Sequence, residues 1–562
     1  MNKQLIECVP NISEGRDIAK INAIAAVVET VEGVKLLEVD PGKATNRTVI
    51  TFVGEPENVI EAAFRLIKKA AELIDMSKHS GEHPRFGATD VCPLVPISGI
   101  TLDEAAVYAH KLGERVGKEL GIPGYYYEKA ATSEIRKNLA NCRAGEYEGL
   151  KDKLVNPTWK PDFGPAQFNE TVARTGAVAI SARDFLIAYN INLNTTSTRR
   201  ANAIAFDIRE AGRVKHEKGT SGKVMLDENG EPIRIPGKLK AVKGIGWYIE
   251  EYGIAQISYN LTNINITPMH IAFDETEKSA TERGLRVTGS ELIGLIPLKA
   301  MLDAGDYFLR KQQRSLGISE AEKIKIAVKS LGLDDLKPFN PNEKIIEYLL
   351  KGDTKKLIDL TVSGFAEETA AESVAPGGGS ISAYVGALGV SLGTMVANLS
   401  SHKAGWDDKW EFYSDWAVKG QAYKNRLLQL VDEDTIAFGK IIDGFRMPKS
   451  TDEEKEARKQ AIEAATIYAT EIPFHIMETA YNSMEVMQAM IKEGMESSIS
   501  DAGVGALCAR TAVVGAYFNV RINAKDIKNR VFAEEIIAKS EVIYQKALAI
   551  EKEVMEFVFS KV

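Results

Sequence analysis

Residues 34–54 read VKLLEVDPGKATNRTVITFVG and contain two runs rich in β-branched residues, separated by the turn-like segment PGKATN. Residues 57–75 and 102–121 carry apolar side chains at helical spacing. The segment between these helices, 88–98, is predicted to be a strand. Its two prolines have no backbone N–H to donate to a neighbouring strand. We therefore expect them in a strand at the edge of the sheet or at the end of a strand. The order of these elements predicts an α+β fold whose sheet is faced by helices.

A second unit of the same kind is expected to begin after Asp184. Its expected strands are 185–194, 239–250 and 254–262, and its expected helices are 197–212 and 268–284. Gly212 is expected to end the first of these helices, and Pro268 to occupy the first turn of the second. Residues 215–238 contain DENGEP and are expected to form a surface hairpin.

The composition changes near residue 350. Only three of the 19 prolines lie beyond residue 357, and Ala, Glu, Lys, Met and Leu dominate there, which favours long helices. We therefore predict a multidomain chain. It consists of two α+β subdomains at 1–184 and 185–350, a linker at 351–356, and an all-α helical bundle at 357–562.

The charge and cysteine content limit the possible functions. The chain has 562 residues, a mass of 61.5 kDa and a formal net charge of −8. Duplex nucleic acid requires a basic face, so we expect no nucleic-acid partner. The four cysteines form no CxxC pair, which argues against a zinc site or a disulfide framework and fits a cytoplasmic location. The first residues include Glu7 and no apolar core of signal-peptide length.

One stretch, 373–401, contains no charged residue and is long enough to cross a bilayer. It is rich in Gly and Ser, has Pro376 near its start, and lacks the Lys/Arg asymmetry and aromatic belt typical of a span. A buried helix is the preferred interpretation, and a membrane span is the alternative. A second stretch of small residues, 500–520, is expected to pack closely against it.

The loop segment GEHPRFGATD, 81–90, holds four polar residues of catalytic type: Glu82, His83, Arg85 and Asp90. Functional groups concentrate in such loops, and a neutral imidazole is a natural general base near pH 7. A surface loop with a cap and a salt bridge is the alternative. His79 and His83 have the spacing of a zinc pair, but Gly81 and Pro84 break the helix that such a pair needs, so no metal is expected.

Two further segments could hold a ligand through the backbone. Residues 7–17, ECVPNISEGRD, have the pattern of a strand end followed by a helix start, where free N–H groups bind anions, although an ordinary capped helix is the alternative. VAPGGGS, 374–380, opens the charge-free helix without the lysine of a P-loop. Glycines there let a ligand approach the backbone, and tight core packing is the alternative. The candidate residues are Gly377, Gly378, Gly379 and Ser380.

An acidic run in a predicted helix supplies a candidate proton donor. The segment VDEDTIAF, 431–438, places Asp434 three residues after Val431, near the apolar face of the helix. A carboxyl group there would be partly desolvated, with a raised pKa that suits proton transfer. A solvated acidic cluster is the alternative.

The chain resembles the formimidoyltransferase–cyclodeaminase family of folate and histidine breakdown along essentially its whole length. The motifs that carry the resemblance are ECVPNISEG, LEVDPGKATNRTV, HSGEHPRFGATDVCP, RAGEYEGL, PDFGP, AYNINL, GIGWY, VAPGGGS and GAYFNVRIN. The resemblance implies two α+β transferase subdomains followed by an all-α cyclodeaminase domain. It implies that His83 is the transferase histidine, with Asp40 as its neighbouring acid beside Asn46 and Arg47, and that Asp434 is the cyclodeaminase acid.

The resemblance also implies the substrates. A formimino group would pass from N-formimino-L-glutamate to N5 of tetrahydrofolate, and ring closure would then give 5,10-methenyltetrahydrofolate and ammonia. Tetrahydrofolate, which can carry a polyglutamate tail, would act as cosubstrate, with no metal and no permanently bound cofactor. Arg47 and Arg85 are the candidates for the substrate carboxylates. The folate segment would fall at about 164–176, where this chain has a few extra residues; the candidates are Gly164, Pro165, Thr175 and Gly176.

Two other interpretations remain open at this point. The chain could retain only one of the two activities, or it could bind folate without turnover as a storage or scaffold protein. The resemblance further implies a homo-oligomer. Lysines between 323 and 356 could hold a polyglutamate tail, with a solvated helix face as the alternative.

Overall fold

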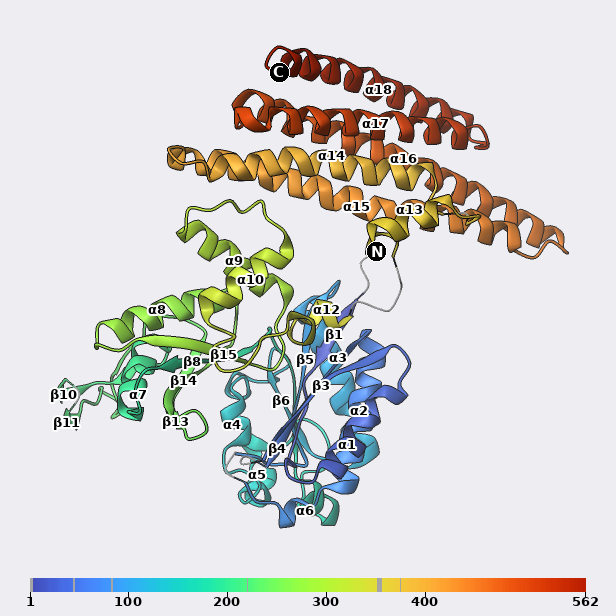
Figure 1. The fold of residues 1–562 in the computed structure, drawn as a ribbon. Coiled ribbons are helices and arrows are strands. Elements are labelled where there is room, and N and C mark those ends of the chain that lie inside the picture. The colour runs from blue at the N-terminus through green and yellow to red at the C-terminus, as the bar shows by residue number, and fades with distance from the viewer. Residues whose placement is uncertain (1–3, 44–45, 82–83, 220, 351–355, 374) are drawn as a thin grey trace. The chain divides into compact units, whose positions relative to one another are not determined.

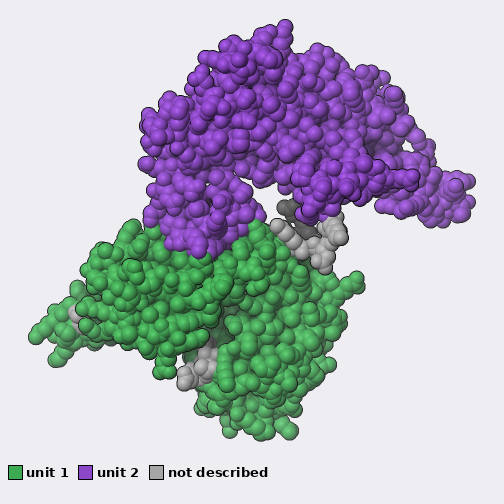
Figure 2. All heavy atoms as spheres, viewed as in Figure 1, with its two compact units in different colours: residues 1–300, 331–351 green, residues 301–330, 352–562 purple. Residues whose placement is uncertain are grey.

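The computed structural model describes residues 4–43, 46–81, 84–219, 221–350, 356–373 and 375–562. Its contacts divide the chain into two compact units, which Figure 2 shows in different colours. The first unit comprises Met1–Ala300 and Leu331–Lys351, and the second comprises Met301–Ser330 and Gly352–Val562. We describe each unit by itself.

The first subdomain is built on a seven-stranded sheet (Figure 1). Strands β1 and β2 are one interrupted strand, and both pair with β4 on one side and β5 on the other. The sheet then continues through β7 to β6 in parallel, while β3 pairs with β4. The strands are β1 Leu5–Cys8, β2 Asn11–Ile12, β3 Val34–Gly42, β4 Arg47–Gly54, β5 Thr89–Ser98, β6 Gly124–Glu128 and β7 Val178–Ala182.

Three helices cover one face of this sheet: α1 Ile18–Ala26, α2 Pro56–Leu73 and α3 Leu102–Arg115. Side chains alternate along a strand, so every second residue of the central strands enters the core under these helices. Ile50 and Phe52 of β4 are fully buried there beside Ile6 and Cys8 of β1. The predicted strands and helices are therefore confirmed, and α2 and α3 begin within one residue of their expected positions.

The expected position of the proline-containing strand is wrong. β5 lies inside the sheet, between β1/β2 and β7, and not at an edge. The neighbouring strand is interrupted between β1 and β2. Fewer backbone N–H groups of β5 are therefore needed for hydrogen bonds with it. Pro93 accepts a hydrogen bond from the Val9 backbone N–H at 3.2 Å, and Pro96 lies beside the irregular register between Leu5 and Ile6.

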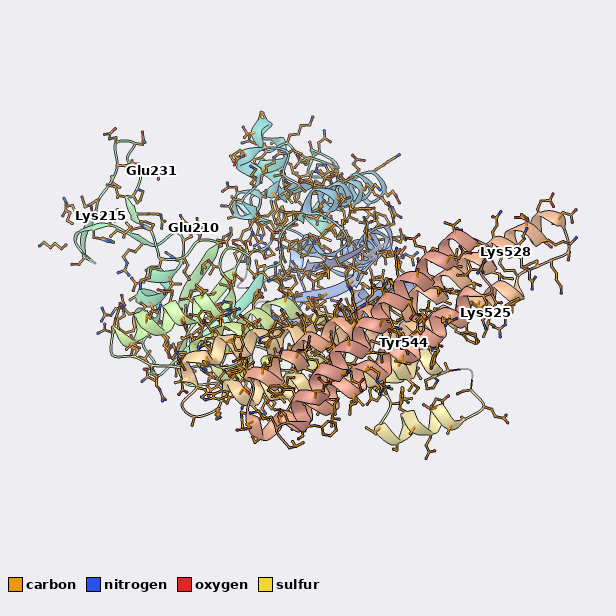
Figure 3. All side chains as sticks on the ribbon, turned by 90° about the horizontal axis from the view of Figure 1, so that it is seen from above. Glu210, Lys215, Glu231, Lys525, Lys528 and Tyr544 are labelled. Carbon is orange, nitrogen blue, oxygen red and sulfur yellow. The ribbon has the colours of Figure 1, made fainter. Side chains whose placement is uncertain are left out.

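The second subdomain has a four-stranded antiparallel sheet in the order β13-β14-β8-β15, with α7 and α8 packed against it. The elements are β8 Ile187–Leu193, α7 Thr198–Ile208, β13 Val242–Ile249, β14 Ile254–Leu261, α8 Met269–Thr281 and β15 Val287–Ile293. Helix α7 ends at Ile208, before Gly212, and Pro268 is the N-cap of α8 and not part of its first turn. Short strands pair within residues 213–219 and 221–235, and Lys215 and Glu231 mark this region in Figure 3.

The second unit is a bundle of helices, as predicted (Figure 1). Glycines let two of its helices approach closely, because a Cβ on Gly389 of α14 would lie 2.7 Å from the carbonyl oxygen of Gly505 on α17. The expected packing of these small-residue stretches is thus confirmed. Tyr544 of α18, labelled in Figure 3, stacks on Tyr517 of α17. The main helices are α14 Gly378–Ser401, α15 Trp410–Arg446, α16 Asp452–Glu493, α17 Ile499–Ala524 and α18 Arg530–Phe559.

One segment packs differently from the expected division. Residues 301–330, expected in the second subdomain, make most of their contacts with the helical unit, and the expected boundary of the subdomain stays a prediction. The carbonyl oxygen of Gly317 accepts hydrogen bonds from Asn398 Nδ2 (2.8 Å) and Gln421 Nε2 (3.1 Å). A Cβ on Gly317 would lie 2.7 Å from Cα of Ala417, so only glycine permits this contact. Residues 351–355 of the expected linker lie outside the described part of the chain.

Two helices of the described chain are long and apolar enough to cross a membrane, Gly378–Ser401 and Glu496–Ala524. In the first, 61% of the most apolar window is buried inside the bundle. Core helices of a bundle pass the same test of length and composition, so these two helices are weak evidence for a span.

Candidate functional site

A cavity of about 380 Å³ lies on the face of the seven-stranded sheet opposite its helices. Because β4 side chains alternate, Arg47, Val49 and Thr51 point to this cavity, while Ile50 and Phe52 point to the core. The second subdomain contributes the residues around 185–188 and 293–295. The cavity therefore lies between the two subdomains of the first unit.

Acidic and basic side chains both line this first cavity. The carboxylates are Glu7, Glu38 and Asp40, and the guanidinium groups are Arg47, Arg143 and Arg183. Burial raises the pKa of Glu7 to about 7, with Arg183 opposing the shift. Glu38 adds to the rise, and its own carboxylate pairs with Lys344 at 3.1 Å. Glu7 can therefore exchange a proton near neutral pH, and the sequence analysis did not identify it as a site residue.

Asp90 organises two of the arginines. This carboxylate is fully buried on β5. One of its oxygens accepts a hydrogen bond from the Phe86 backbone N–H at 3.1 Å, and the other pairs with Arg47 and with Arg143, the latter at 3.2 Å. Arg47 also donates from Nε to Asn11 Oδ1 at 2.9 Å. The direction of both guanidinium groups is thus fixed by protein contacts.

A second cavity, of about 550 Å³, is lined by Asn46 and His79 together with Ser13, Glu14, Lys20, Leu73, Ile74, Asp75, Lys78 and Arg174. His79 Nε2 lies 3.0 Å from the carbonyl oxygen of Asn46, and its Nδ1 accepts from Arg85 Nε at 3.2 Å. Arginine can only donate, so the proton of the neutral imidazole belongs on Nε2. Burial lowers the pKa of His79, which favours this neutral form.

The structure distributes the predicted transferase residues between these two cavities. Asp40 and Arg47 line the first cavity and Asn46 the second. His83 lies outside the described residues. Arg85 is not among the described residues that line either cavity, because Glu148 binds its guanidinium through two hydrogen bonds of 2.8 and 2.9 Å. Its expected contact with a substrate carboxylate would have to compete with this ion pair.

The predicted folate segment contains two glycines that the backbone requires. Gly164 and Gly176 have φ of +75° and +66°. A Cβ on Gly176 would lie 2.6 Å from Cα of Gly87, and one on Gly164 would lie 2.8 Å from Cα of Pro123. Of the four candidates Gly164, Pro165, Thr175 and Gly176, all of them described, none lines the first or the second cavity. Folate contacts at these positions stay a prediction.

The helical unit brings together two predicted motifs that are 54 residues apart. Ser380, in the first turn of α14, donates from Oγ to Asp434 Oδ2 of α15 at 2.9 Å. Gly379 lies so close that a Cβ there would be 2.6 Å from the carboxyl carbon of Asp434. Burial raises the pKa of Asp434, and the hydrogen bonds from Ser380 oppose the shift. A carboxyl group in this setting is suited to donate a proton.

The rest of the acidic run differs from a solvated cluster. Asp432 accepts a hydrogen bond from the Leu357 backbone N–H at 2.9 Å, and Glu433 pairs with Arg426 at 2.6 Å. Only Asp434 of the three carboxylates contacts the glycine-rich turn among the described residues. The three acids therefore have three different partners.

Sequence reasoning missed one residue of this site, Asn519 of α17. A Cβ on Gly378 would lie 3.3 Å from Asn519 Nδ2, and this amide donates to the Gly515 carbonyl oxygen at 2.8 Å. Its position in the motif GAYFNVRIN was the available signal. The described residues contain no group of three or more His, Cys, Asp or Glu side chains that could hold a metal ion.

Comparisons with known proteins agree with two sheet-containing subdomains followed by a helical domain, and keep residues 301–330 with the second subdomain. Three family models match consecutive parts of the chain: the formiminotransferase domain N-terminal subdomain at 5–183, the formiminotransferase domain at 188–351, and formiminotransferase-cyclodeaminase at 361–542. The methenyltetrahydrofolate cyclohydrolase of Methylorubrum extorquens is 32% identical over 202 residues, which are 36% of this chain and 97% of that protein.

Longer relatives cover both units. The formimidoyltransferase-cyclodeaminase of Mus musculus is 41% identical over 546 residues, which are 97% of this chain and 97% of that protein. The Gallus gallus protein of the same name is 42% identical over 534 residues, 95% of this chain and 94% of that protein. The chain therefore belongs to the formimidoyltransferase-cyclodeaminase family.

Proposed function

We propose that this chain is a bifunctional enzyme that transfers a formimino group from N-formimino-L-glutamate to N5 of tetrahydrofolate and then closes the ring to 5,10-methenyltetrahydrofolate with release of ammonia. The observation that carries the proposal is the contact of Asp434 with Gly379 and Ser380 in the helical unit. This contact supports a second active site, in the helical unit, in addition to the transferase site of the first unit.

The transfer step requires a base and an anion-binding group. N5 of tetrahydrofolate loses a proton as it attacks the amidine carbon, and His83 is the proposed base, with Asp40 in the first cavity orienting or stabilising it. Collapse of the tetrahedral intermediate expels the glutamate nitrogen, which takes up a proton. Arg47, in the same cavity, is proposed to bind a carboxylate of the glutamate.

The ring-closing step requires a proton donor. N10 attacks the same carbon, and the remaining nitrogen must be protonated to leave as ammonia. Burial raises the pKa of Asp434 and so increases the fraction of carboxyl groups that keep a proton for this purpose. Ser380 holds the carboxyl in place, and the absence of a side chain on Gly379 lets it approach the turn. Tetrahydrofolate is the proposed cosubstrate of both steps, with no permanently bound cofactor.

One assay separates this proposal from its alternatives. Purified protein is mixed with N-formimino-L-glutamate and tetrahydrofolate, and the absorbance of the methenyl product is followed. A transferase alone would release glutamate and accumulate 5-formiminotetrahydrofolate, and a storage protein would release nothing. A cyclodeaminase alone would form product only from added 5-formiminotetrahydrofolate.

We also propose that the chain forms a homo-oligomer through its helical unit. Large apolar side chains are exposed on α17, where Phe518 and Ile522 have exposed fractions of 64% and 60%. Light scattering after size exclusion would test this proposal, and a monomer at micromolar concentration would contradict it.

A further inference from the structure

Three arginines line the first cavity, and two of them share a single buried acid. We propose that Arg143 and Arg47, both held by Asp90, form the subsite that binds a carboxylate of the glutamyl group of a substrate. This inference rests on the proposed transferase function. It assigns a binding role to Arg143 and a positioning role to Asp90.

The charges at this subsite do not balance. Asp90 is fully buried, and the same oxygen, Oδ2, contacts both guanidinium groups. Two positive charges therefore face one negative charge, and each guanidinium lowers the electrostatic stability of the other. Their side chains are only 10% and 14% exposed, so water screens this repulsion weakly. An incoming carboxylate would give these two guanidinium groups a second anionic partner at the side of the cavity away from Asp40 and the other acids, which is the arrangement we infer.

Arg143 also has an unused donor. Its Nε is buried and has no hydrogen-bond partner among the described residues, while one of its Nη groups reaches Asp90. A buried N–H without a partner is costly, and a carboxylate in the cavity could accept from it. Arginine presents its donors as a rigid fork that matches a carboxylate, which makes Nε and an adjacent Nη a suitable pair.

The segment that carries Arg143 is fixed before any ligand arrives. Arg143 ends the short helix α4, Leu139–Arg143. Lys153 Nζ donates to the carbonyl oxygens of Asn141, Cys142 and Ala144 at 2.9, 2.7 and 3.0 Å, and Cys142 is fully buried. Little conformational entropy would be lost when the guanidinium binds a ligand, because its backbone is already ordered.

The other charges of the cavity favour an amino-acid ligand over an inorganic anion. Asp40 lines the same cavity and would repel a phosphate or sulfate ion. It would attract the cationic amidine of a formimino group. A ligand with a carboxylate at one end and an amidinium at the other therefore matches the pair Arg143 and Asp40. The glutamyl group of folate offers the same carboxylate chemistry, so the experiment must separate the two sources.

The test measures binding without turnover in the full-length protein. Calorimetry gives the Kd of L-glutamate and of its two monoamides, L-glutamine and L-isoglutamine, and then of folic acid and of the two monoamides of its glutamyl group. The wild type is expected to bind the ligand that has the carboxylate about 10–100-fold more tightly than the ligand that lacks it, as for a charge-assisted hydrogen bond. In Arg143→Met that preference should fall to about 2-fold or less. The ligand pair that loses its preference identifies the source of the carboxylate.

Three further variants control the result. Arg143→Lys keeps the charge without the fork and should retain an intermediate preference. Arg283→Met removes a comparably buried arginine that pairs with Asp207 in the second subdomain, and should leave both preferences unchanged. Asp90→Asn keeps the side-chain shape but frees both guanidinium groups. It should weaken carboxylate binding and raise KM for formiminoglutamate more than it lowers kcat.

Two outcomes must be kept apart. If the wild type forms methenyl product but Arg143→Met and Arg143→Lys discriminate carboxylates as well as the wild type, the subsite is elsewhere and this inference is overturned. If the wild type forms no product from formiminoglutamate and tetrahydrofolate, the proposed function fails, whatever the binding data show. Should Arg143→Met not fold, Arg143→Lys alone decides, because an unchanged preference in that variant excludes recognition by the fork.

Discussion

Replacing Gly379 with alanine tests the cyclodeaminase site most directly. The new Cβ would lie 2.6 Å from the carboxyl carbon of Asp434, whereas ordinary contact begins near 3.4 Å. The carboxyl must therefore move by at least about 3.4 − 2.6 = 0.8 Å, because its Oδ1 lies closer still to the new Cβ. Its hydrogen bond with Ser380, now 2.9 Å, would then lengthen beyond hydrogen-bonding distance. A displacement of about 1 Å at a reacting group costs roughly 10²-fold in rate.

Gly379→Ala should therefore slow ring closure of supplied 5-formiminotetrahydrofolate about 100-fold and leave the release of glutamate from formiminoglutamate unchanged. Methenyl absorbance measures the first reaction, and a coupled glutamate assay measures the second. Gly378→Ala, whose Cβ would lie 3.3 Å from Asn519, should give a smaller loss.

The matched control is Gly439→Ala, on α15 with Asp434, because a Cβ there meets no atom within 4 Å. It should keep both activities and stabilise the helix by up to about 1 kcal/mol. If Gly379→Ala closes the ring within about 2-fold of the Gly439→Ala rate, the geometry of this turn does not control the reaction.

Three other substitutions have expected outcomes. His83→Ala should lower formimino transfer about 10²–10⁴-fold while ring closure of the supplied intermediate continues; an unchanged transfer rate would remove this histidine from the mechanism. Asp434→Asn should still consume formiminoglutamate but accumulate 5-formiminotetrahydrofolate, and normal methenyl formation without that intermediate would contradict its role. Glu7→Gln tests a stability effect. The folded pKa of Glu7 is about 7 against an ordinary 4.5, so the wild type should lose up to roughly 1.36 × 2.5 ≈ 3 kcal/mol of unfolding free energy relative to the variant as pH rises from 4.5 to 7. Denaturant unfolding of both proteins at pH 5, 6 and 8 checks this, and a difference that is constant with pH would show that Glu7 does not titrate in that range.

The strands of the first sheet could be predicted, but not which face would line a cavity. In β4 the residues Thr48, Ile50 and Phe52 enter the core, while Arg47 and the alternate positions after it line the cavity. Both faces contain a threonine and apolar residues, so alternation alone does not distinguish them. Thr48 is tolerated in the interior because its hydroxyl donates to the Glu14 carbonyl oxygen.

The partners of the GEHPRFGATD loop could not be predicted for a similar reason. Arg85 and Asp90 are five residues apart, and a local salt bridge was the simple alternative. In the structure Arg85 binds Glu148, and Asp90 binds Arg143. Glu148 and Arg143 come from the segment RAGEYEGL, more than 50 residues further along the chain, and Asp90 also binds Arg47 of β4. Local pattern shows that a charge needs a partner, and only the packing of α4 against the sheet decides which one.

The contacts of residues 301–330 with the helical unit could not be predicted, because amphipathic spacing shows that one face of a helix is buried but not which partner covers it. The outcome depends on a single small residue, Gly317, whose carbonyl oxygen accepts two side-chain amides of the helical unit. Nothing in the periodicity of the neighbouring helices marks that contact.

The neighbours of Glu7, Asp434 and Asp90 differ, and so do the roles for which each carboxyl group is suited. Burial raises the pKa of Glu7 and of Asp434. Among the described residues, neither carboxyl group is in direct contact with a guanidinium group. The Ser380 hydroxyl that binds Asp434 stabilises a carboxylate less than a cation would. Glu7, with a pKa of about 7, can gain and lose a proton near neutral pH, and the raised pKa of Asp434 favours its protonated form. Asp90 is fully buried and contacts two guanidinium groups, so it fixes their direction. The two proposals thus assign proton transfer to one carboxyl group and ligand positioning to another, and exchanging Asp90 and its arginines for neutral residues should abolish carboxylate binding before it affects proton transfer.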